Sequence, residues 1–119
     1  MATWPRPVVH WEIQALDPQR IREFYATMFE WVMSPGPIPQ ITNIAAGVGG
    51  PEPGPGGHIQ PGDAGRVVLY VQVADMRASM KQAEALGGKV LQEPFDVPGG
   101  PTVARIADPE GNQIGLIQQ

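Results

Sequence analysis

The chain has 119 residues and a mass of 12.8 kDa, with 42% hydrophobic and 17% charged residues. Disordered chains have fewer apolar residues and a larger net charge, so we expect one compact folded domain. A net charge of −4 and the lack of any Lys/Arg run argue against a nucleic-acid-binding surface. The absence of cysteine excludes disulfides, thiolate catalysis and cysteine-ligated zinc. No apolar segment approaches the ~18 residues of a membrane span, and we expect a soluble, cytoplasmic protein.

The two halves of the chain form an internal repeat. Residues 8–17 (VVHWEIQALD) align without gaps on residues 66–75 (RVVLYVQVAD), which places Gln14 on Gln72 and Asp17 on Asp75. Residues 8–14 alternate between two faces, as in a half-buried strand. In each half the Asp then caps a predicted helix with an apolar stripe. The pattern in both halves is therefore a strand, a capping Asp and a helix.

Three short strands are predicted after each helix. In the second half they cover residues 88–95, 102–107 and 113–117, separated by Gly- and Pro-containing turns. In the first half the counterparts are residues 31–34, 40–46 and about 56–60. Each half is thus a βαβββ unit, with repeat 1 at about residues 7–60 and repeat 2 at about 65–119. A Gly/Pro-rich stretch, residues 34–65, joins the two repeats, which are expected to share one core.

Short motifs in a fixed order carry a resemblance over nearly the whole chain. They are VHWEI at 9–13, DP at 17–18, YVQVAD at 70–75, LGG at 86–88 and DPEGN at 108–112. In this order they resemble the vicinal-oxygen-chelate (VOC) superfamily of glyoxalase I, extradiol dioxygenases and bleomycin- and fosfomycin-resistance proteins. The resemblance implies an α+β fold in which two βαβββ repeats form a cup-shaped mixed sheet with the helices outside. It also implies a small-molecule ligand and a homodimer, while the net charge and the lack of a long apolar segment argue against nucleic-acid and membrane partners.

The resemblance places metal ligands on the first and last strands of each repeat. The corresponding positions hold one histidine and three residues without a ligating side chain: His10, Val68, Gly115 and, 58 residues before Gly115, Gly57. Differences in loop length leave the last of these open by one or two residues. His10 is then the only retained ligand. A divalent ion usually needs three or more protein ligands, so we expect no metal cofactor, and dioxygenase chemistry is disfavoured. A rearranged site that recruits Glu12 or His58 stays an alternative.

Polar residues of the first strand are the main site candidates. His10, Glu12 and Gln14 share one face of that strand, while Val9, Trp11 and Ile13 supply the core face. This pattern predicts a ligand-facing cluster in which His10 and Glu12 could act as an acid–base pair. The alternative is that the face is merely solvated.

Four further residues complete the predicted ligand site. Tyr70 and Gln72 match Glu12 and Gln14 across the repeat and are expected to face the same cup. Trp31 could form a wall of the pocket or simply belong to the core. His58 lies among glycines that permit close approach of a ligand, whereas a lone His in such a loop is usually solvent-exposed.

Three hypotheses for function follow. The first is a glyoxalase/bleomycin-resistance-like small-molecule-binding protein with a degenerate metal site. The second is a lyase or isomerase that uses His10 and Glu12, or an atypical divalent-metal site. The third is a non-catalytic structural or interaction domain. The residues favour the first, because most metal-ligand positions are lost while polar groups remain on the candidate face.

Overall fold

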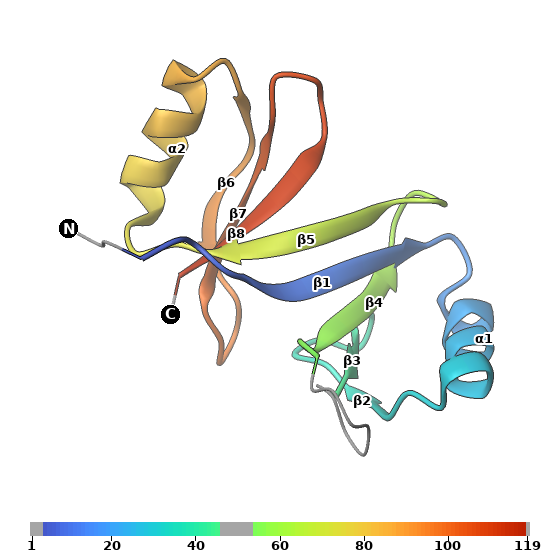
Figure 1. Cartoon of the computed structure of the whole chain (residues 1–119). Helices are drawn as coiled ribbons and strands as arrows, with labels where there is room; N and C mark the ends of the chain where they lie inside the picture. Colours follow the sequence, from blue (N-terminus) through green and yellow to red (C-terminus); the bar gives the residue numbers. More distant parts are fainter. Residues whose placement is uncertain (1–3, 46–53, 119) are drawn as a thin grey trace. The chain divides into compact units, whose positions relative to one another are not determined.

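The computed structural model describes residues 4–45 and 54–118. Figure 1 shows the elements in chain order. They are β1 (Val8–Ala15), α1 (Pro18–Phe29), β2 (Met33–Pro35), β3 (Thr42–Ile44), β4 (Gly57–Pro61), β5 (Val67–Gln72), α2 (Met76–Ala85), β6 (Lys89–Asp96), β7 (Thr102–Ala107) and β8 (Gln113–Gln118). The chain divides into two compact units. The first is His10–Val68, and the second is Leu69–Gln119 together with Met1–Val9.

The two units share one pattern of strand pairing. In the first, β1 pairs in parallel with β4, and β4, β3 and β2 follow as antiparallel neighbours. In the second, β5 pairs in parallel with β8, and β8, β7 and β6 follow in the same way. Equal connectivity around one helix each confirms the predicted α+β fold built from βαβββ repeats. Residues 34–65 contain β3 and β4, so most of the Gly/Pro-rich stretch belongs to the first repeat.

Both helices begin where the sequence predicts. The carboxylate of Asp17 accepts a hydrogen bond from the Arg20 amide at 3.2 Å, and α1 starts with Pro18. The carboxylate of Asp75 accepts one from the Ala78 amide at 3.0 Å at the start of α2. These side chains satisfy amides that have no partner inside the helix. After α2, Gly87 adopts a φ of 93°, which favours glycine.

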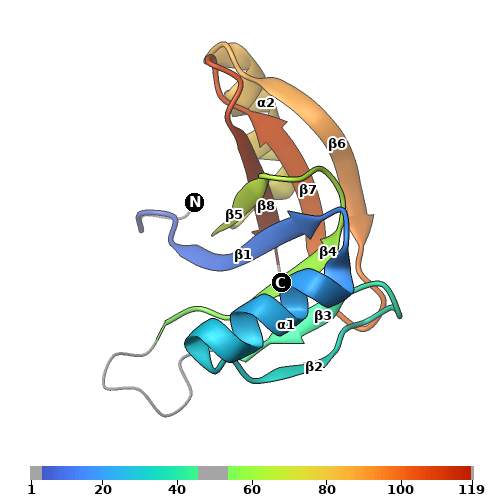
Figure 2. The ribbon, with the colours of Figure 1, turned by 90° about the vertical axis from the view of Figure 1, so that its right-hand side faces the viewer.

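Each unit has its own hydrophobic core. In the first unit, α1 runs along one face of the strands (Figure 2), and Ala15, Ile44 and Ile59 are buried beneath it. In the second unit, α2 contacts β6, β7 and β8, and the buried residues are Val73, Met76, Met80, Ala104 and Leu116. In the part of the chain that the structure describes, neither helix is long and apolar enough to cross a membrane.

Strand bounds differ from the predicted ones mainly near the prolines. β2 and β3 are shorter than residues 31–34 and 40–46 suggested, and residue 46 lies outside the described part of the chain. The connection between them is a tight turn in which the Gly36 amide donates to the Ile41 carbonyl at 2.8 Å. Pro37 and Pro39 lie in this turn and have no N–H with which to extend the ladder.

Candidate functional site

A row of polar residues crosses all four strands of the first unit. Ser34 on β2 lies opposite Asn43 on β3, and Asn43 lies opposite His58 on β4. His58 in turn lies opposite Glu12 on β1. Directly paired residues point to the same face of a sheet, so four polar side chains share one face. His10 and Gln14 join them, because alternate residues of β1 share a face.

Hydrogen bonds link these side chains into one network. The Glu12 side chain is fully buried, with 0% of the residue exposed. Its Oε2 accepts a hydrogen bond from Gln14 Nε2 at 2.8 Å, and its Oε1 lies 3.2 Å from His58 Nε2. His58 Nδ1 lies 2.7 Å from His10 Nε2. Glu12 is therefore connected through His58 to His10.

Two acceptors locate a proton on the His58 ring. His58 Nε2 lies 2.9 Å from the amide oxygen of Gln60, which can only accept, so this nitrogen carries a proton. The other ring nitrogen of His58, Nδ1, shares a hydrogen bond with His10 Nε2. Burial lowers the pKa of His10 to about 4; the charge of His58 adds to this effect and Glu12 opposes it. His10 is consequently neutral at physiological pH.

A cavity of about 380 Å³ adjoins this network in the first unit. His10, Ser34 and Asn43 form part of its wall, together with backbone at Gly56 and Gly57. The neutral imidazole, the hydroxyl and the amide can each donate and accept hydrogen bonds. The arrangement can hold an organic molecule by hydrogen bonds, and an oriented imidazole can also move a proton.

The second unit carries a different set of residues in the equivalent row. Gln92 on β6 lies opposite Arg105 on β7, Arg105 opposite Gly115 on β8, and Gly115 opposite Tyr70 on β5. Arg105 Nη2 donates to the Tyr70 hydroxyl at 3.1 Å. The Tyr70 ring lies directly over Gly115, where a Cβ atom would be 2.5 Å from two ring carbons. The ring thus fills the space of a side chain at position 115.

The strand register corrects one of the predicted metal-ligand positions. Glu12 matches Tyr70 in the repeat, and their partners on the last strands are His58 and Gly115. His58, and not Gly57, is therefore the fourth position, so His10 is not the only one of the four positions that holds a metal-binding side chain. Gly57 lies opposite Trp11 on the other face, where the Trp11 ring leaves no space for a Cβ atom. The gapless alignment missed this because loop lengths differ between the repeats.

The donors at these four positions do not fit the metal site that the resemblance implies. Val68 has no donor atom and is 0% exposed, and Gly115 is covered by Tyr70. His10 and His58 are hydrogen-bonded to each other. Within residues 4–45 and 54–118, no group of three or more His, Asp or Glu is arranged to hold a metal ion. We therefore derive no chemistry through a metal.

The structure brings together four of the predicted site residues and separates one. His10, Glu12, Gln14 and His58 form the network. His58 lies in β4 with a side chain only 12% exposed, so the expectation of a solvent-exposed loop histidine was wrong. Trp31 lies instead in an aromatic cluster, with its ring centroid 4.9 Å from those of both Trp11 and Tyr25. It belongs to the core beneath α1, which is the alternative that the sequence left open.

Tyr70 and Gln72 lie in the second unit, and their expected place beside His10 stays a prediction. Sequence reasoning missed Ser34, Asn43 and Arg105. A signal existed only for Arg105, which is the single charged residue in the predicted strand 102–107. Ser34 and Asn43 lie among prolines and glycines, where alternation gives no clear face.

Comparison with known families agrees with this fold. The family described as Glyoxalase-like domain matches residues 10–117. The chain belongs to this family, and with it to the VOC superfamily. No curated protein matches this glyoxalase-like chain by sequence.

Solved structures show the same fold at low sequence identity. A glyoxalase/bleomycin resistance protein/dioxygenase superfamily member from Vibrio splendidus 12B01 has a TM-score of 0.67 and 12% identity, covering 97% of this chain and 100% of that one. Methylmalonyl-CoA epimerase from Mycobacterium tuberculosis has a TM-score of 0.62 and 16% identity, covering 99% and 91%. The Mn(II)-bound glyoxalase from Novosphingobium aromaticivorans has a TM-score of 0.58 and 20% identity, covering 95% of this chain and 38% of that one. At such identities the likeness extends to the fold alone.

Proposed function

We propose that this glyoxalase-like protein binds a small organic molecule at the polar face of its first repeat, with a degenerate metal site. The observation that carries the proposal is the fully buried Glu12, connected through His58 to His10 at the wall of a cavity. Burying a carboxyl group is costly even when it is paired. The other polar side chains in the row across β1 to β4 add a further desolvation cost. A row that is costly for stability is better explained by the binding of a ligand.

The cavity chemistry supports a neutral or cationic ligand. Its wall offers the neutral imidazole of His10, the Ser34 hydroxyl and the Asn43 amide. Within the described part of the chain, no Lys or Arg side chain lines this cavity. The carboxyl group of Glu12 lies behind His58. An anionic ligand would meet no positive charge in this wall, whereas a cationic one would be attracted by Glu12.

Binding can be tested with untagged, metal-free protein. A panel of neutral and cationic aromatic compounds that includes bleomycin is screened by thermal shift, and hits are measured by calorimetry. We expect saturable binding that His10→Ala and Glu12→Gln each weaken about tenfold, which corresponds to one hydrogen bond of ~1.4 kcal/mol. Gln19→Ala on the exposed surface of α1 is the matched control. No stabilising compound, or equal affinity in all variants, would contradict the proposal and favour a non-catalytic interaction domain.

A second candidate function is a metal-independent lyase or isomerase. The specific observation in its favour is the Glu12–His58–His10 connection, since a carboxyl group that orients imidazoles is a common arrangement in acid–base catalysis. A neutral ketone with an acidic hydrogen next to its carbonyl group is a suitable probe, because the described residues of the cavity wall offer no positive charge to an anionic substrate. Exchange of its α-hydrogen in D₂O, lost in His10→Ala with binding retained, would support the enzyme. Saturable binding of the screened ligand without any hydrogen exchange would instead favour a binding protein without catalytic activity. The expected homodimer stays a prediction for either function.

A further inference from the structure

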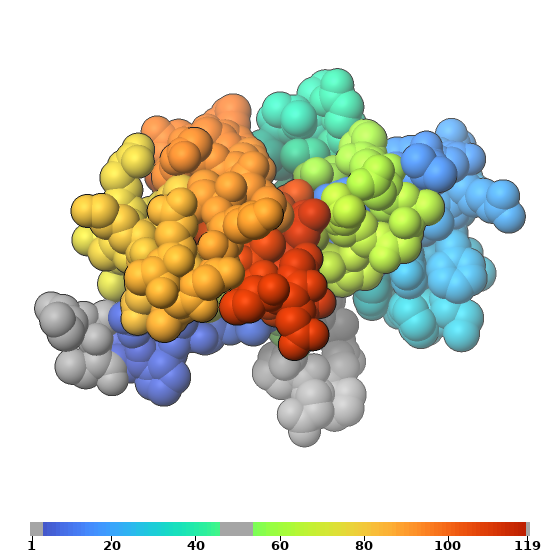
Figure 3. Space-filling view, turned by 90° about the horizontal axis from the view of Figure 1, so that it is seen from above, coloured from blue at the N-terminus to red at the C-terminus, as the bar shows by residue number. Residues whose placement is uncertain are grey.

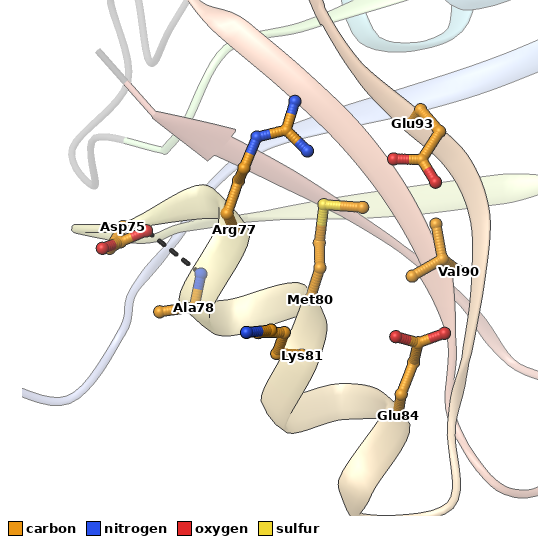
Figure 4. Close-up of a pocket in the computed structure, with 8 residues that line it drawn as sticks. All are labelled: Asp75, Arg77, Ala78, Met80, Lys81, Glu84, Val90 and Glu93. Atoms are coloured by element: carbon orange, nitrogen blue, oxygen red, sulfur yellow. Dashed lines mark hydrogen bonds between the residues drawn. The ribbon is translucent and has the colours of Figure 1, made fainter.

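A second cavity lies in the other unit, between helix α2 and strand β6 (Figure 4). Its volume is about 460 Å³, and its walls come from α2, its capping residue Asp75, and β6. β6 is the last strand in the order β5-β8-β7-β6 of this unit. In the space-filling view, α2 (yellow) and β6 (orange) lie side by side at the surface (Figure 3). We call this cavity the α2–β6 groove.

Irregular pairing of β6 places a carboxylate in the groove. Val90 and Glu93 both line it, although residues three apart on a regular strand point to opposite faces. The register explains this, because Val90 pairs with Ile106 while Gln92 pairs with Arg105, so β6 uses one residue more than β7. Such a bulge redirects the following side chains. Glu93 therefore turns toward α2 rather than away from it.

The groove has an apolar floor and charged walls. Met80 is 6% exposed and belongs to the core of the unit, and Val90 packs against the same core. Two cations on α2, Arg77 and Lys81, and two carboxylates, Glu84 and Glu93, surround this floor. Figure 4 shows the two carboxylates on either side of Val90 and Arg77 near the start of the helix.

The charged groups of the groove do not neutralise one another. In the described part of the chain, none of Arg77, Lys81, Glu84 and Glu93 forms an ion pair with another of the four. Asp75 also lines the groove, but its carboxylate caps α2. Two cations and two anions are thus available at an apolar floor, which is complementary to a ligand with one charge of each sign and an apolar part between them.

We propose that the α2–β6 groove binds a small zwitterionic molecule of the amino-acid or dipeptide type. Its ammonium group lies at Glu93, its carboxylate at Arg77, and its side chain on Met80 and Val90. The charged groups are solvent-exposed, so each ion pair is weak and the affinity is in the millimolar range. The proposal goes beyond the function proposed above, because the groove uses no residue of the His10 network.

The dipeptide leucyl-glycine is the probe for this proposal. In a titration of the ¹⁵N-labelled protein followed by NMR, we expect saturating shifts of the Ala78, Lys81, Val90 and Glu93 amides. N-acetyl-leucyl-glycine lacks the ammonium group and leucyl-glycinamide lacks the carboxylate, and each should bind at least about fivefold more weakly. Shifts that do not saturate, or equal binding of all three peptides, would overturn the proposal.

Charge-matched variants assign each end of the ligand. Arg77→Gln should weaken leucyl-glycine about threefold or more but leave leucyl-glycinamide unchanged, because only the former has the carboxylate. Glu93→Gln should weaken leucyl-glycine by a similar factor but leave the acetylated peptide unchanged. Arg20→Gln and Glu23→Gln on α1 make the same charge changes away from the groove and should have no effect. If Arg77→Gln and Glu93→Gln do not change the affinity for leucyl-glycine, the assignment is refuted. His10→Ala should not change this affinity, and this variant therefore separates the test of the α2–β6 groove from the test of the His10 site.

Discussion

Replacing Gly115 with alanine tests whether Tyr70 fills the ligand position of the second repeat. A Cβ atom at residue 115 would lie 2.5 Å from Cδ2 and Cε2 of Tyr70 and 2.8 Å from its Cγ. Ordinary contacts of this kind are about 3.5–4.0 Å, so the ring must move by roughly 1 Å. That movement also disturbs the hydrogen bond from Arg105 to the Tyr70 hydroxyl.

The expected loss follows from these two effects. Overpacking of a close-packed site costs about 1–3 kcal/mol, and a disturbed hydrogen bond costs about 0.5–1.5 kcal/mol. Removing a strand glycine returns roughly 0.5–1 kcal/mol of conformational entropy. Together these terms give a loss of roughly 0.5–4 kcal/mol, so Gly115→Ala should lower the free energy of unfolding by about 2 kcal/mol, a large part of the ~5–15 kcal/mol typical of a domain.

Urea unfolding followed by circular dichroism measures this loss in a double-mutant cycle. In a Tyr70→Ala background, alanine at residue 115 should be neutral or slightly stabilising, so the coupling energy should be about 1–3 kcal/mol. Gly54→Ala is the control, because a Cβ atom there meets no atom within 4 Å. If the free energy of unfolding of Gly115→Ala differs from that of the wild type by less than about 0.5 kcal/mol, position 115 has room for a side chain. The steric reasoning against a ligand there would then be wrong.

Three further predictions concern the first repeat. Because the pKa of His10 is lowered from 6.5 to about 4, the unfolded chain takes up a proton between these values that the folded chain does not. The free energy of unfolding should therefore fall as the pH decreases through this window, by about 1–2 kcal/mol once the partial exposure of His10 is allowed for. If His10→Gln loses as much unfolding free energy as the wild type between pH 7 and pH 5, the lowered pKa is contradicted. Glu12→Ala removes the acceptor of Gln14 and a partner of His58, and should cost about 3 kcal/mol in urea unfolding, against less than about 0.5 kcal/mol for exposed Glu23→Ala. Mass spectrometry of untagged protein should find no stoichiometric divalent metal, and chelation should leave the melting temperature unchanged; a bound metal whose removal lowers it would show that the donors were misjudged.

Most of the fold could be predicted from the sequence because its signals are local. Capping by Asp17 and Asp75, the αL glycine after α2 and the alternation of residues 8–14 each act over a few residues. The strand 102–107 was predicted with the bounds that the structure has. Local signals failed in residues 34–65, where prolines interrupt alternation and shorten β2 and β3.

The candidate site was predicted less completely because it depends on which residues pair across strands. The sequence showed that His10, Glu12 and Gln14 share a face, since this follows from the periodicity of one strand. It could not show that Ser34, Asn43 and His58 continue the same row. Those neighbours depend on the register of β2, β3 and β4, which is set by turn geometry rather than by spacing along one strand.

The fourth ligand position illustrates how small differences in loop length change the interpretation of a site. Measured between paired row positions, the connection from β2 to β3 is four residues shorter than that from β6 to β7, and the one from β3 to β4 is five residues longer than that from β7 to β8. The two differences nearly cancel, so a gapless alignment looks acceptable and is wrong by one residue on the last strand. In a strand, one residue exchanges the two faces. That single residue replaces Gly57, which lies under Trp11, by His58, which connects Glu12 to His10. The first repeat therefore holds a histidine at both of these positions, whereas the second holds Val68 and Gly115, whose side chains have no donor atom.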